Sequence, residues 1–327
     1  MSNFRQVQVG EVTLRVALQG GGPLVVLVHG FPESWYSWRH QMGPIAAAGF
    51  TACAIDVRGY GGSDKPHEVE AYSLEHLSGD VAGLIAALSP DKPAVVIGHD
   101  WGAPIAWTTA LVHPDRVRAV AGLSVPYTGA PQQSLREIVE AVYTSQDRFS
   151  HLHSFEAEGV AEVEFEADVR GGLRRFFYAW SGDASAEAWP SDKRAGDPVL
   201  LRVPDPDLLP AWLTDADIDY YVSEFEQSGF RGPLNRYRNN DRDFAFLRGF
   251  EGRRIEQPAL YIGGERDRVL QMFGDRLPLM RGALPDLRGL HLLPGCGHWT
   301  QQERPQAVND QLSTWLRGLR RVYEYTP

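Results

Sequence analysis

The sequence has few cysteines, no dense basic cluster and no long hydrophobic run. Its two cysteines, Cys53 and Cys296, are too few for a disulfide framework or a cysteine-based zinc site. Acidic residues outnumber basic ones by 42 to 32, which argues against nucleic-acid binding because phosphates need a basic face. No apolar run reaches the roughly 18 residues of a bilayer span. Residues 1–10 also lack the apolar stretch of a signal peptide, so we expect a cytoplasmic protein.

The composition that is present favours a folded chain of one large domain or two ordinary ones. The chain has 327 residues, of which 43% are hydrophobic and 11% aromatic, enough to bury a full core. The net charge of −10 is interpreted as a solubilising surface. His29 and His40 have no Glu or His at metal-ligand spacing, so the sequence indicates neither a metal nor a cofactor.

Short apolar runs alternate with segments of helical period along most of the chain. Two alternating stretches at residues 7–9 and 12–18 predict a hairpin, and the continuous aliphatic run at 24–28 predicts a buried strand. Similar runs follow at residues 51–55, 94–97, 117–123, 259–262 and 290–293, with helical spacing at 74–88 between two of them. This alternation predicts an α/β fold with a mainly parallel, doubly wound sheet.

The alternation stops near Tyr127 and resumes near Ala259. Residues 129–243 contain no buried-strand run but do contain amphipathic stretches, at 135–143 and 218–225. Because structureless loops beyond about 15 residues are uncommon, we interpret this segment as an inserted helical cap domain. Residues 1–128 and 244–327 then form the core domain, with the cap over the carboxyl edge of the sheet, where ligands bind in such folds.

A strand that runs into Gly98-His99-Asp100-Trp101-Gly102 and then a helix is the most informative segment. Gly98 and Gly102 leave room for strand and helix to approach, so that Asp100 can hold a strained backbone with its side chain exposed. This context is typical of a nucleophile elbow, with Asp where hydrolases usually have Ser. The alternative is an ordinary strand-to-helix turn with Asp100 as the N-cap.

Three other loops leave the carboxyl ends of predicted strands and favour the elbow. His29-Gly30-Phe31-Pro32 places the Phe31 N–H where it can converge with the Trp101 N–H as an oxyanion hole. Asp267 and His298 follow the last two predicted strands, and the resulting order of nucleophile, acid and histidine is the order described for this fold.

Four separated segments carry a family resemblance that covers nearly the whole chain. Residues 29–39, 56–63, 98–102 and 230–239 resemble the motifs of α/β-hydrolase-fold epoxide hydrolases, in that family's order. The resemblance implies that Asp100 opens an epoxide to form an alkyl ester, that His298 activates water to hydrolyse it, and that Asp267 orients His298. Glu265 is the competing candidate for the acid, although the match of Glu-Arg-Asp to the family motif favours Asp267.

The chemistry of a carboxylate nucleophile limits the substrate class. A carboxylate suits displacement at a saturated carbon, which selects epoxides or alkyl halides over esters. The partners expected are therefore a small-molecule epoxide and water. A dehalogenase that uses the same triad is the alternative, although Leu152 stands where fluoroacetate-type dehalogenases have Trp. A non-catalytic binding protein on this fold is the third reading, and the sequence leaves open a homo-oligomer.

Opening an epoxide also needs a proton donor for the ring oxygen, and the resemblance implies two donors from the cap. Tyr237 matches one of them through its Arg-Gly-Pro-Leu-Asn-Arg-Tyr context, whereas the other position aligns with His151 instead of the usual Tyr. His153, Tyr178 and Tyr143 remain alternatives for this second donor. A histidine with a pKa of about 6.5 predicts a ring-opening step more sensitive to pH than a tyrosine pair.

Several aromatic and polar residues near these motifs have other expected roles. Trp35 and Trp38 follow the oxyanion loop and are expected to bind substrate. His99 precedes the nucleophile and is expected to be structural, while Asp56 and Arg58 are expected to hold a loop in place.

Overall fold

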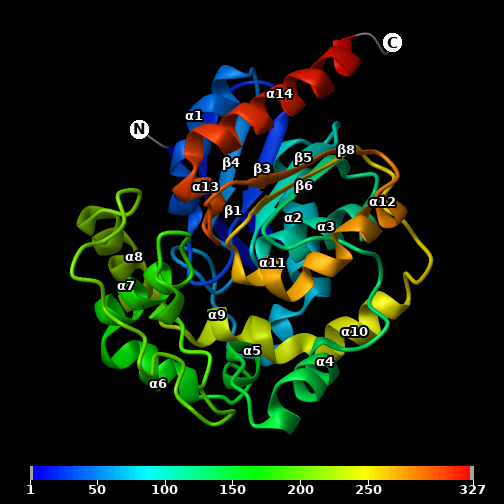
Figure 1. Ribbon diagram of the computed structural model, residues 1–327. Coiled ribbons are helices and arrows are strands. Elements are labelled where there is room, and N and C mark those ends of the chain that lie inside the picture. Colours follow the sequence, from blue (N-terminus) through cyan, green and yellow to red (C-terminus); the bar gives the residue numbers. More distant parts are fainter. Residues whose placement is uncertain (1–2, 325–327) are drawn as a thin grey trace.

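In the computed structural model, which describes residues 3–324, eight strands form one sheet in the order β1-β2-β4-β3-β5-β6-β7-β8 (Figure 1). β2 pairs antiparallel with both β1 and β4, and the other neighbours are parallel. The strands are β1 (Asn3–Val9), β2 (Val12–Gly20), β3 (Leu24–Val28), β4 (Thr51–Ile55), β5 (Ala94–His99), β6 (Val117–Leu123), β7 (Ala259–Gly264) and β8 (Leu287–Leu293).

The predicted fold class, a mainly parallel doubly wound sheet, is confirmed. Each apolar run lies within a strand, and the run at 51–55 is β4 itself. β8 begins at Leu287, three residues before the predicted run, because Arg288 and Gly289 interrupt the apolar pattern on this edge strand. An edge strand contacts only one neighbour, so its sequence needs no continuous apolar run.

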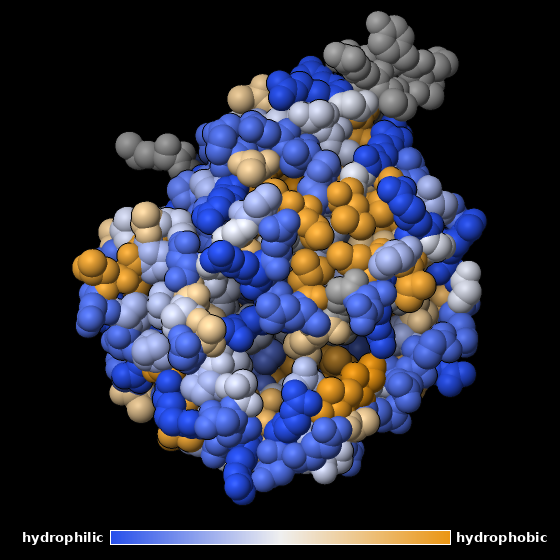
Figure 2. Space-filling view, viewed as in Figure 1, coloured by the Kyte–Doolittle hydropathy of each residue, from blue (hydrophilic) through white to orange (hydrophobic). Residues whose placement is uncertain are grey.

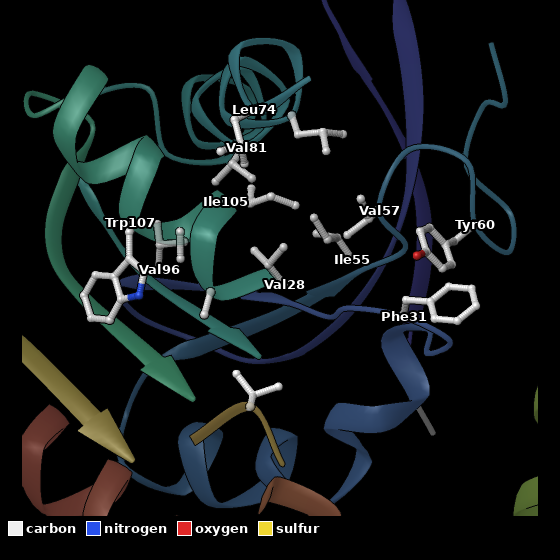
Figure 3. Close-up of a cluster of buried hydrophobic side chains, with 14 of the residues drawn as sticks. Val28, Phe31, Ile55, Val57, Tyr60, Leu74, Val81, Val96, Ile105 and Trp107 are labelled. Carbon is white, nitrogen blue, oxygen red and sulfur yellow. The ribbon is translucent and has the colours of Figure 1, made fainter. Parts of the chain in front are cut away.

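Helices cover both faces of the sheet. α1 (Arg39–Ala47) and α14 (Pro305–Glu324) pack on one face, and α2 (Leu74–Leu88) and α3 (Gly102–Val112) on the other. Successive strand residues point to opposite faces, so Val25 and Leu27 of β3 face α1 while Val26 and Val28 face α2 and α3. Figure 3 shows the hydrophobic cluster between the sheet and helices α2 and α3. It includes Val28, Ile55, Val96, Leu74, Val81 and Ile105.

A helical insert separates β6 from β7 and lies along the end of the core in Figure 1. It contains α4 (Leu135–Val142), α5 (His151–Ser154), α6 (Val160–Ala167), α7 (Val169–Ala179), α8 (Asp215–Ser228), α9 (Arg231–Asn235), α10 (Asn240–Arg248) and the short 3-10 helices η3 (Thr144–Gln146), η4 (Ala186–Ala188) and η5 (Arg236–Asn239). Residue 243, the predicted end of the cap, falls within α10.

The remaining short helices connect the core elements. They are η1 (Trp35–Trp38), η2 (Val69–Tyr72), α11 (Arg268–Phe273), η6 (Gly274–Leu279), α12 (Met280–Ala283) and α13 (Thr300–Glu303). η1 leads directly into α1, and α11 follows β7 at the carboxyl edge of the sheet.

A buried ion pair joins the end of the insert to the core. Arg236, in η5, pairs with Asp243 of α10 and also donates a hydrogen bond to the carbonyl of Tyr72. Oδ1 of Asp243 accepts a hydrogen bond from the amide of Leu74 at 2.7 Å, at the first residue of α2. Because Arg236 is 3% exposed, the cap is attached beside the start of α2 by a fully desolvated charge pair.

Hydrophilic residues cover most of the face in Figure 2, and apolar residues gather near the β8 edge of the sheet. Leu292 of β8 and Leu279 of η6 are among the exposed large hydrophobic residues. Within residues 3–324, each helix is too short or too polar to cross a bilayer.

Candidate active site

Asp100 lies at a sharp turn between β5 and α3, with its backbone in the left-handed region at φ 51°. Two glycines permit the turn. A Cβ at Gly98 would lie 1.9 Å from the carbonyl oxygen of Gly102, and one at Gly102 would lie 2.0 Å from the carbonyl oxygen of Val28. Any side chain at either position would collide with backbone, so the sequence around Asp100 produces a strained turn that presents its carboxylate.

The carboxylate of Asp100 has two partners. Oδ1 accepts a hydrogen bond from the Phe31 amide at 2.8 Å, and Oδ2 lies 3.3 Å from Nε2 of His298. Burial alone would raise the pKa of Asp100, but the hydrogen bond and the charge of His298 outweigh it, and the pKa is lowered. Asp100 is therefore an ionised carboxylate at neutral pH.

His298 is held between two carboxylates. Its Nδ1 lies 3.0 Å from Oδ1 of Asp267, which also accepts a hydrogen bond from the Val269 amide at 2.9 Å. Burial would lower the pKa of His298, but Asp267 and Asp100 together raise it well above the ordinary value. Glu265, the competing candidate, is exposed, whereas Asp267 is fully buried against the imidazole.

Buried polar groups fix the loop that carries His298. The His298 carbonyl faces Nε2 of His99 at 2.7 Å and accepts a hydrogen bond from Oγ of Ser124 at 2.9 Å. Nδ1 of His99 lies 2.8 Å from a carboxylate oxygen of Glu33, which is also buried. His99 thus has the structural position expected for it. Ser124 was missed, because only its positive φ of 69° after β6 marks it, and this cannot be read from the sequence.

A cavity of about 120 Å³ opens in front of Asp100 and His298. Both cap residues proposed as proton donors, Tyr237 of η5 and His151 of α5, lie on its wall, and their ring centroids are 6.4 Å apart. The other lining residues are apolar: Phe31, Trp101, Pro104, Val125, Leu135, Leu152, Phe176, Trp180, Val269 and Met272. The volume is similar to that of a cavity of about 150 Å³ that binds benzene. It therefore suits a reacting ring with a small substituent.

Burial keeps both cap residues in forms that can donate a hydrogen bond. Burial and the charge of Asp100 raise the pKa of Tyr237 well above its ordinary value, so the phenol stays protonated. Burial lowers the pKa of His151 to about 3, so its ring is neutral and carries one N–H. This differs from the expectation of a group that titrates near pH 6.5, since His151 is enclosed by Phe155, Trp180 and Trp189.

The three alternatives for the second donor lie away from this cavity. His153 is exposed and lies 3.7 Å from a carboxylate oxygen of Glu156. Tyr178 accepts a hydrogen bond from the Ser185 amide, and Tyr143 stacks against Arg148. Of the four candidates, the structure brings only His151 to the cavity that Asp100 lines.

Trp35 and Trp38, which were expected to bind substrate, do not line the cavity. They lie in η1, which leads into α1, and they pack with α1 and α14 on the face of the sheet that lies away from α2 and α3. Trp38 is fully buried, and Nε1 of Trp35 donates a hydrogen bond to the Tyr220 hydroxyl at 2.6 Å. The expectation fails because η1 leads directly into α1, so that its tryptophans pack with α1 and, for Trp35, against Tyr220 of α8 instead of lining the cavity.

The loop residues Asp56 and Arg58 have the structural positions expected of them. Asp56 accepts hydrogen bonds from the amides of Trp35 and Gly62, and Arg58 forms two hydrogen bonds to Asp80. Within the described residues, no group of three or more His, Cys, Asp or Glu side chains is arranged to hold a metal ion.

Trp180 is a cavity residue that the sequence analysis missed. Its ring centroid lies 5.3 Å from that of His298 and 4.8 Å from that of His151, and its carbonyl accepts a hydrogen bond from the His298 amide at 3.0 Å. It therefore connects His151 of the cap with His298. No motif marks it, because the cap contains many aromatic residues with similar spacing.

An elbow after a parallel strand, with Asp100, His298 and Asp267 brought together beside a helical insert, is the arrangement of an enzyme of the α/β-hydrolase class. Residues 23–305 match the alpha/beta hydrolase fold family. The chain is 39% identical to epoxide hydrolase B of Mycobacterium tuberculosis over 91% of this chain and 92% of the relative. It is 37% identical to an epoxide hydrolase of Caballeronia sordidicola over 96% of this chain and 93% of that one.

A solved structure of similar shape is an epoxide hydrolase from an endophytic Streptomyces. The TM-score is 0.93 at 44% identity, and the match covers 98% of this chain and 96% of the other. The chain belongs to the epoxide hydrolases of the alpha/beta hydrolase fold family.

Proposed function

We propose that this protein hydrolyses a small-molecule epoxide to a vicinal diol through an alkyl ester on Asp100. The observation that carries the proposal is the position of the ionised Asp100 carboxylate, between the Phe31 amide and His298, in a cavity whose wall also carries Tyr237 and His151. A carboxylate nucleophile displaces at saturated carbon, and the cap offers the opening epoxide oxygen a proton from Tyr237 and a hydrogen bond from His151.

In the first step, Oδ2 of Asp100 attacks a ring carbon and the bond from that carbon to the ring oxygen breaks. Oδ1, which the Phe31 amide holds at 2.8 Å, becomes the carbonyl oxygen of the ester. The developing alkoxide takes a proton from the Tyr237 phenol, and the N–H of neutral His151 donates a hydrogen bond to the same oxygen.

Alkylation changes the charge around His298. Esterification removes the negative charge of Asp100, one of the two carboxylates that raise the pKa of His298. The imidazolium then loses its proton more readily, and that proton returns the Tyr237 phenolate to the phenol. The first step thus converts His298 from a cation into the general base of the second.

In the second step, His298 takes a proton from water, and the hydroxide oxygen attacks the ester carbon. The oxyanion forms on Oδ1, where the Phe31 amide and the amide of Trp101 serve as donors. Collapse breaks the bond to the alkyl oxygen, which takes the proton from the Asp100 carboxyl group. The diol leaves, and Asp100 and the protonated His298 are restored.

The mass of a His298→Gln variant after incubation with substrate tests this reading. An adduct equal to the whole epoxide, absent when Asp100 is also changed to Asn, would establish ring opening on Asp100. An adduct equal to a haloalkane minus its hydrogen halide, with none from epoxides, would instead indicate a dehalogenase. The absence of both adducts, with no turnover by the wild type, would favour a binding protein.

The cavity wall argues against a haloacid substrate. Such a substrate has a carboxylate next to the reacting carbon, and this would need a cation in the cavity. The lining residues include neither Arg nor Lys, and the positive charge of His298 is already paired with the carboxylates of Asp100 and Asp267. A cytoplasmic location stays a prediction from the sequence.

A further inference from the structure

The cap and the loop that carries His298 are in direct backbone contact. The His298 amide donates a hydrogen bond to the Trp180 carbonyl at 3.0 Å. A Cβ at Gly182, two residues after Trp180, would lie 2.6 Å from the nitrogen of Gly297, and a Cβ at Gly297 would lie 2.1 Å from the nitrogen of Gly182. Any side chain at either position would collide with backbone, so this close approach requires both glycines.

Glu303, the last residue of α13, accepts hydrogen bonds from both sides of this contact. Its Oε2 accepts one from the Gly182 amide at 2.9 Å and one from the Gly297 amide at 2.8 Å, and its Oε1 accepts one from the Trp299 amide at 3.0 Å. Gly297 and Trp299 flank His298 in the sequence, whereas Gly182 belongs to the cap. One carboxylate therefore joins the residues on either side of His298 to the cap.

An ordinary helix-start role explains only one of the three hydrogen bonds. The bond from the Trp299 amide is local, because Trp299 is the N-cap of α13. The other two come from amides outside the helix that would otherwise be buried without a partner. Glu303 is 4% exposed, and this burial raises the pKa of its carboxyl group although the three amides oppose the rise. Gln has the same shape but only one acceptor oxygen, so it cannot accept all three bonds.

Arg266 holds the same part of the cap from the other side. It precedes Asp267, and its Nη1 donates a hydrogen bond to the Gly182 carbonyl at 2.8 Å. Gly182 is thus bound to the loops of both His298 and Asp267, through its amide and its carbonyl respectively.

The position of Asp100 is fixed by other groups. Its carboxylate is held by the elbow turn and by the Phe31 amide at 2.8 Å, and the Tyr237 ring packs against the rings of Phe31 and Trp101. Loosening the loop of His298 would therefore leave the proposed nucleophile and the phenol in place.

We infer that Glu303 is a positioning residue for the hydrolytic step, because it holds the imidazole of His298 where it can activate a water against the ester on Asp100. The inference rests on the proposed function, which supplies that ester. Glu303 does not line the cavity in front of Asp100, so it acts only through the backbone of the His298 loop. A displacement of about 1 Å in such a group can slow a reaction on the order of 10²-fold.

Glu303→Gln, assayed with styrene oxide, tests the inference. In the two-step scheme kcat/KM reports the steps up to alkylation, whereas slower hydrolysis lowers kcat and KM by the same factor. Glu303→Gln slows ester hydrolysis about 10²-fold, lowers kcat and KM together and leaves kcat/KM nearly unchanged. The ester then accumulates, as measured by acid quench and intact mass. A smaller folded fraction would instead lower kcat at constant KM.

Two further variants keep the test independent of folding. Glu303→Asp retains the charge on a side chain one methylene shorter, and restores part of the hydrolysis rate. Arg266 is exposed, and Arg266→Gln removes only the hydrogen bond to the Gly182 carbonyl, so it slows hydrolysis by about fivefold with the same joint fall of kcat and KM. Arg254→Gln is its matched control at an exposed arginine that pairs with Glu256, and leaves both steps unchanged.

Asp80→Asn is the matched control for Glu303→Gln. Asp80 is a buried carboxylate of α2 whose two side-chain hydrogen bonds come from Arg58. Its substitution removes a buried negative charge and lowers stability, but leaves the rate of ester hydrolysis unchanged.

The outcomes separate this inference from the proposed function. A kcat that falls at constant KM in Glu303→Gln, without accumulation of ester, would assign Glu303 a structural role and overturn the inference. Equal slowing of alkylation and hydrolysis would overturn it as well, since the whole site would then depend on Glu303. In both cases an ester on Asp100 of the wild type would leave the epoxide hydrolase standing. If the wild type forms no such ester from any epoxide, both fail.

Discussion

Oδ2 of Asp100 lies 3.3 Å from Nε2 of His298, so the proposed nucleophile of the first step is also a counter-ion of the proposed base of the second. While Asp100 is ionised, it helps to keep the imidazole protonated and therefore unable to accept a proton from water. Once Asp100 is esterified, this restraint disappears. In the proposed mechanism, one contact thus sets the order of the two chemical steps.

The two steps are expected to respond differently to acid. Alkylation needs ionised Asp100, whose pKa is lowered, and a protonated Tyr237, whose pKa is raised, so it persists at mildly acidic pH. Hydrolysis needs neutral His298, whose pKa Asp267 still raises in the ester. Lowering the pH from about 8 to about 5 should therefore increase the fraction of wild-type enzyme trapped as ester, measured by acid quench and intact mass.

A variant pair checks the origin of this effect. Asp267→Asn should slow ester hydrolysis by roughly 10³-fold or more while leaving alkylation measurable, because it removes the group that orients His298. Glu265→Gln changes an exposed carboxylate and should leave both steps unchanged. An ester fraction that falls as the pH falls would contradict the assigned roles.

The same charge coupling predicts a pH-dependent contribution to stability. The folded pKa of His298 is raised, so its ionised form stabilises the folded state. This contribution is complete below the unfolded pKa of about 6.5 and is lost as the pH rises through the folded pKa. The difference in free energy of unfolding between the wild type and His298→Gln should therefore be largest near pH 6 and decrease towards alkaline pH. Denaturant unfolding at several pH values measures it, and a difference that grows with pH would contradict the raised pKa.

Some features of this site could be predicted from the sequence and others could not. The motif around Asp100, the order of Asp267 and His298, and the strand at 51–55 follow from local glycine spacing and apolar runs, which depend on neighbouring residues. The positions of Trp35 and Trp180 could not be predicted in this way. They depend on how the cap packs on the core and on which face of the sheet η1 approaches, and these are long-range properties.

The pKa of His151 likewise could not be predicted from the sequence. The resemblance placed a histidine at the donor position, and a free imidazole titrates at about 6.5. The enclosure that lowers its pKa to about 3 is formed by Trp180 and Trp189, residues that no motif connects with His151. Tertiary packing therefore decides the protonation state of a residue that the sequence alone could only locate.

The two cap donors are expected to contribute unequally to ring opening. Tyr237→Phe removes the group that transfers a proton and should slow alkylation by about 10²-fold or more, whereas His151→Phe removes a hydrogen bond and should cost less. Rates of adduct formation in the His298→Gln background isolate this step. Because His151 is already neutral, the alkylation rate of the His298→Gln variant that retains Tyr237 should show no inflection near pH 6.5 when it is plotted against pH. Such an inflection, absent in His151→Phe, would show that His151 titrates there.

The ion pair between Arg236 and Asp243 is expected to hold the cap donor Tyr237 in place. Arg236 precedes Tyr237, and its guanidinium carbon lies 4.6 Å from the ring centroid of Trp101, which follows the nucleophile. Asp243→Asn would leave the buried guanidinium without its counter-ion, which costs about 3–5 kcal/mol of unfolding free energy.

Asp241→Asn is the matched control on the same helix, α10. Asp241 is 57% exposed and pairs with Arg136, itself 47% exposed, so its loss should change stability by less than about 1 kcal/mol. Thermal unfolding of both variants, together with the alkylation rate at a temperature where each is folded, measures the two effects. Equal stability of the two variants would mean that the buried pair does not anchor the cap. A destabilised Asp243→Asn with unchanged alkylation would mean that Tyr237 is positioned by the aromatic rings of Phe31, Trp101 and Phe155 alone.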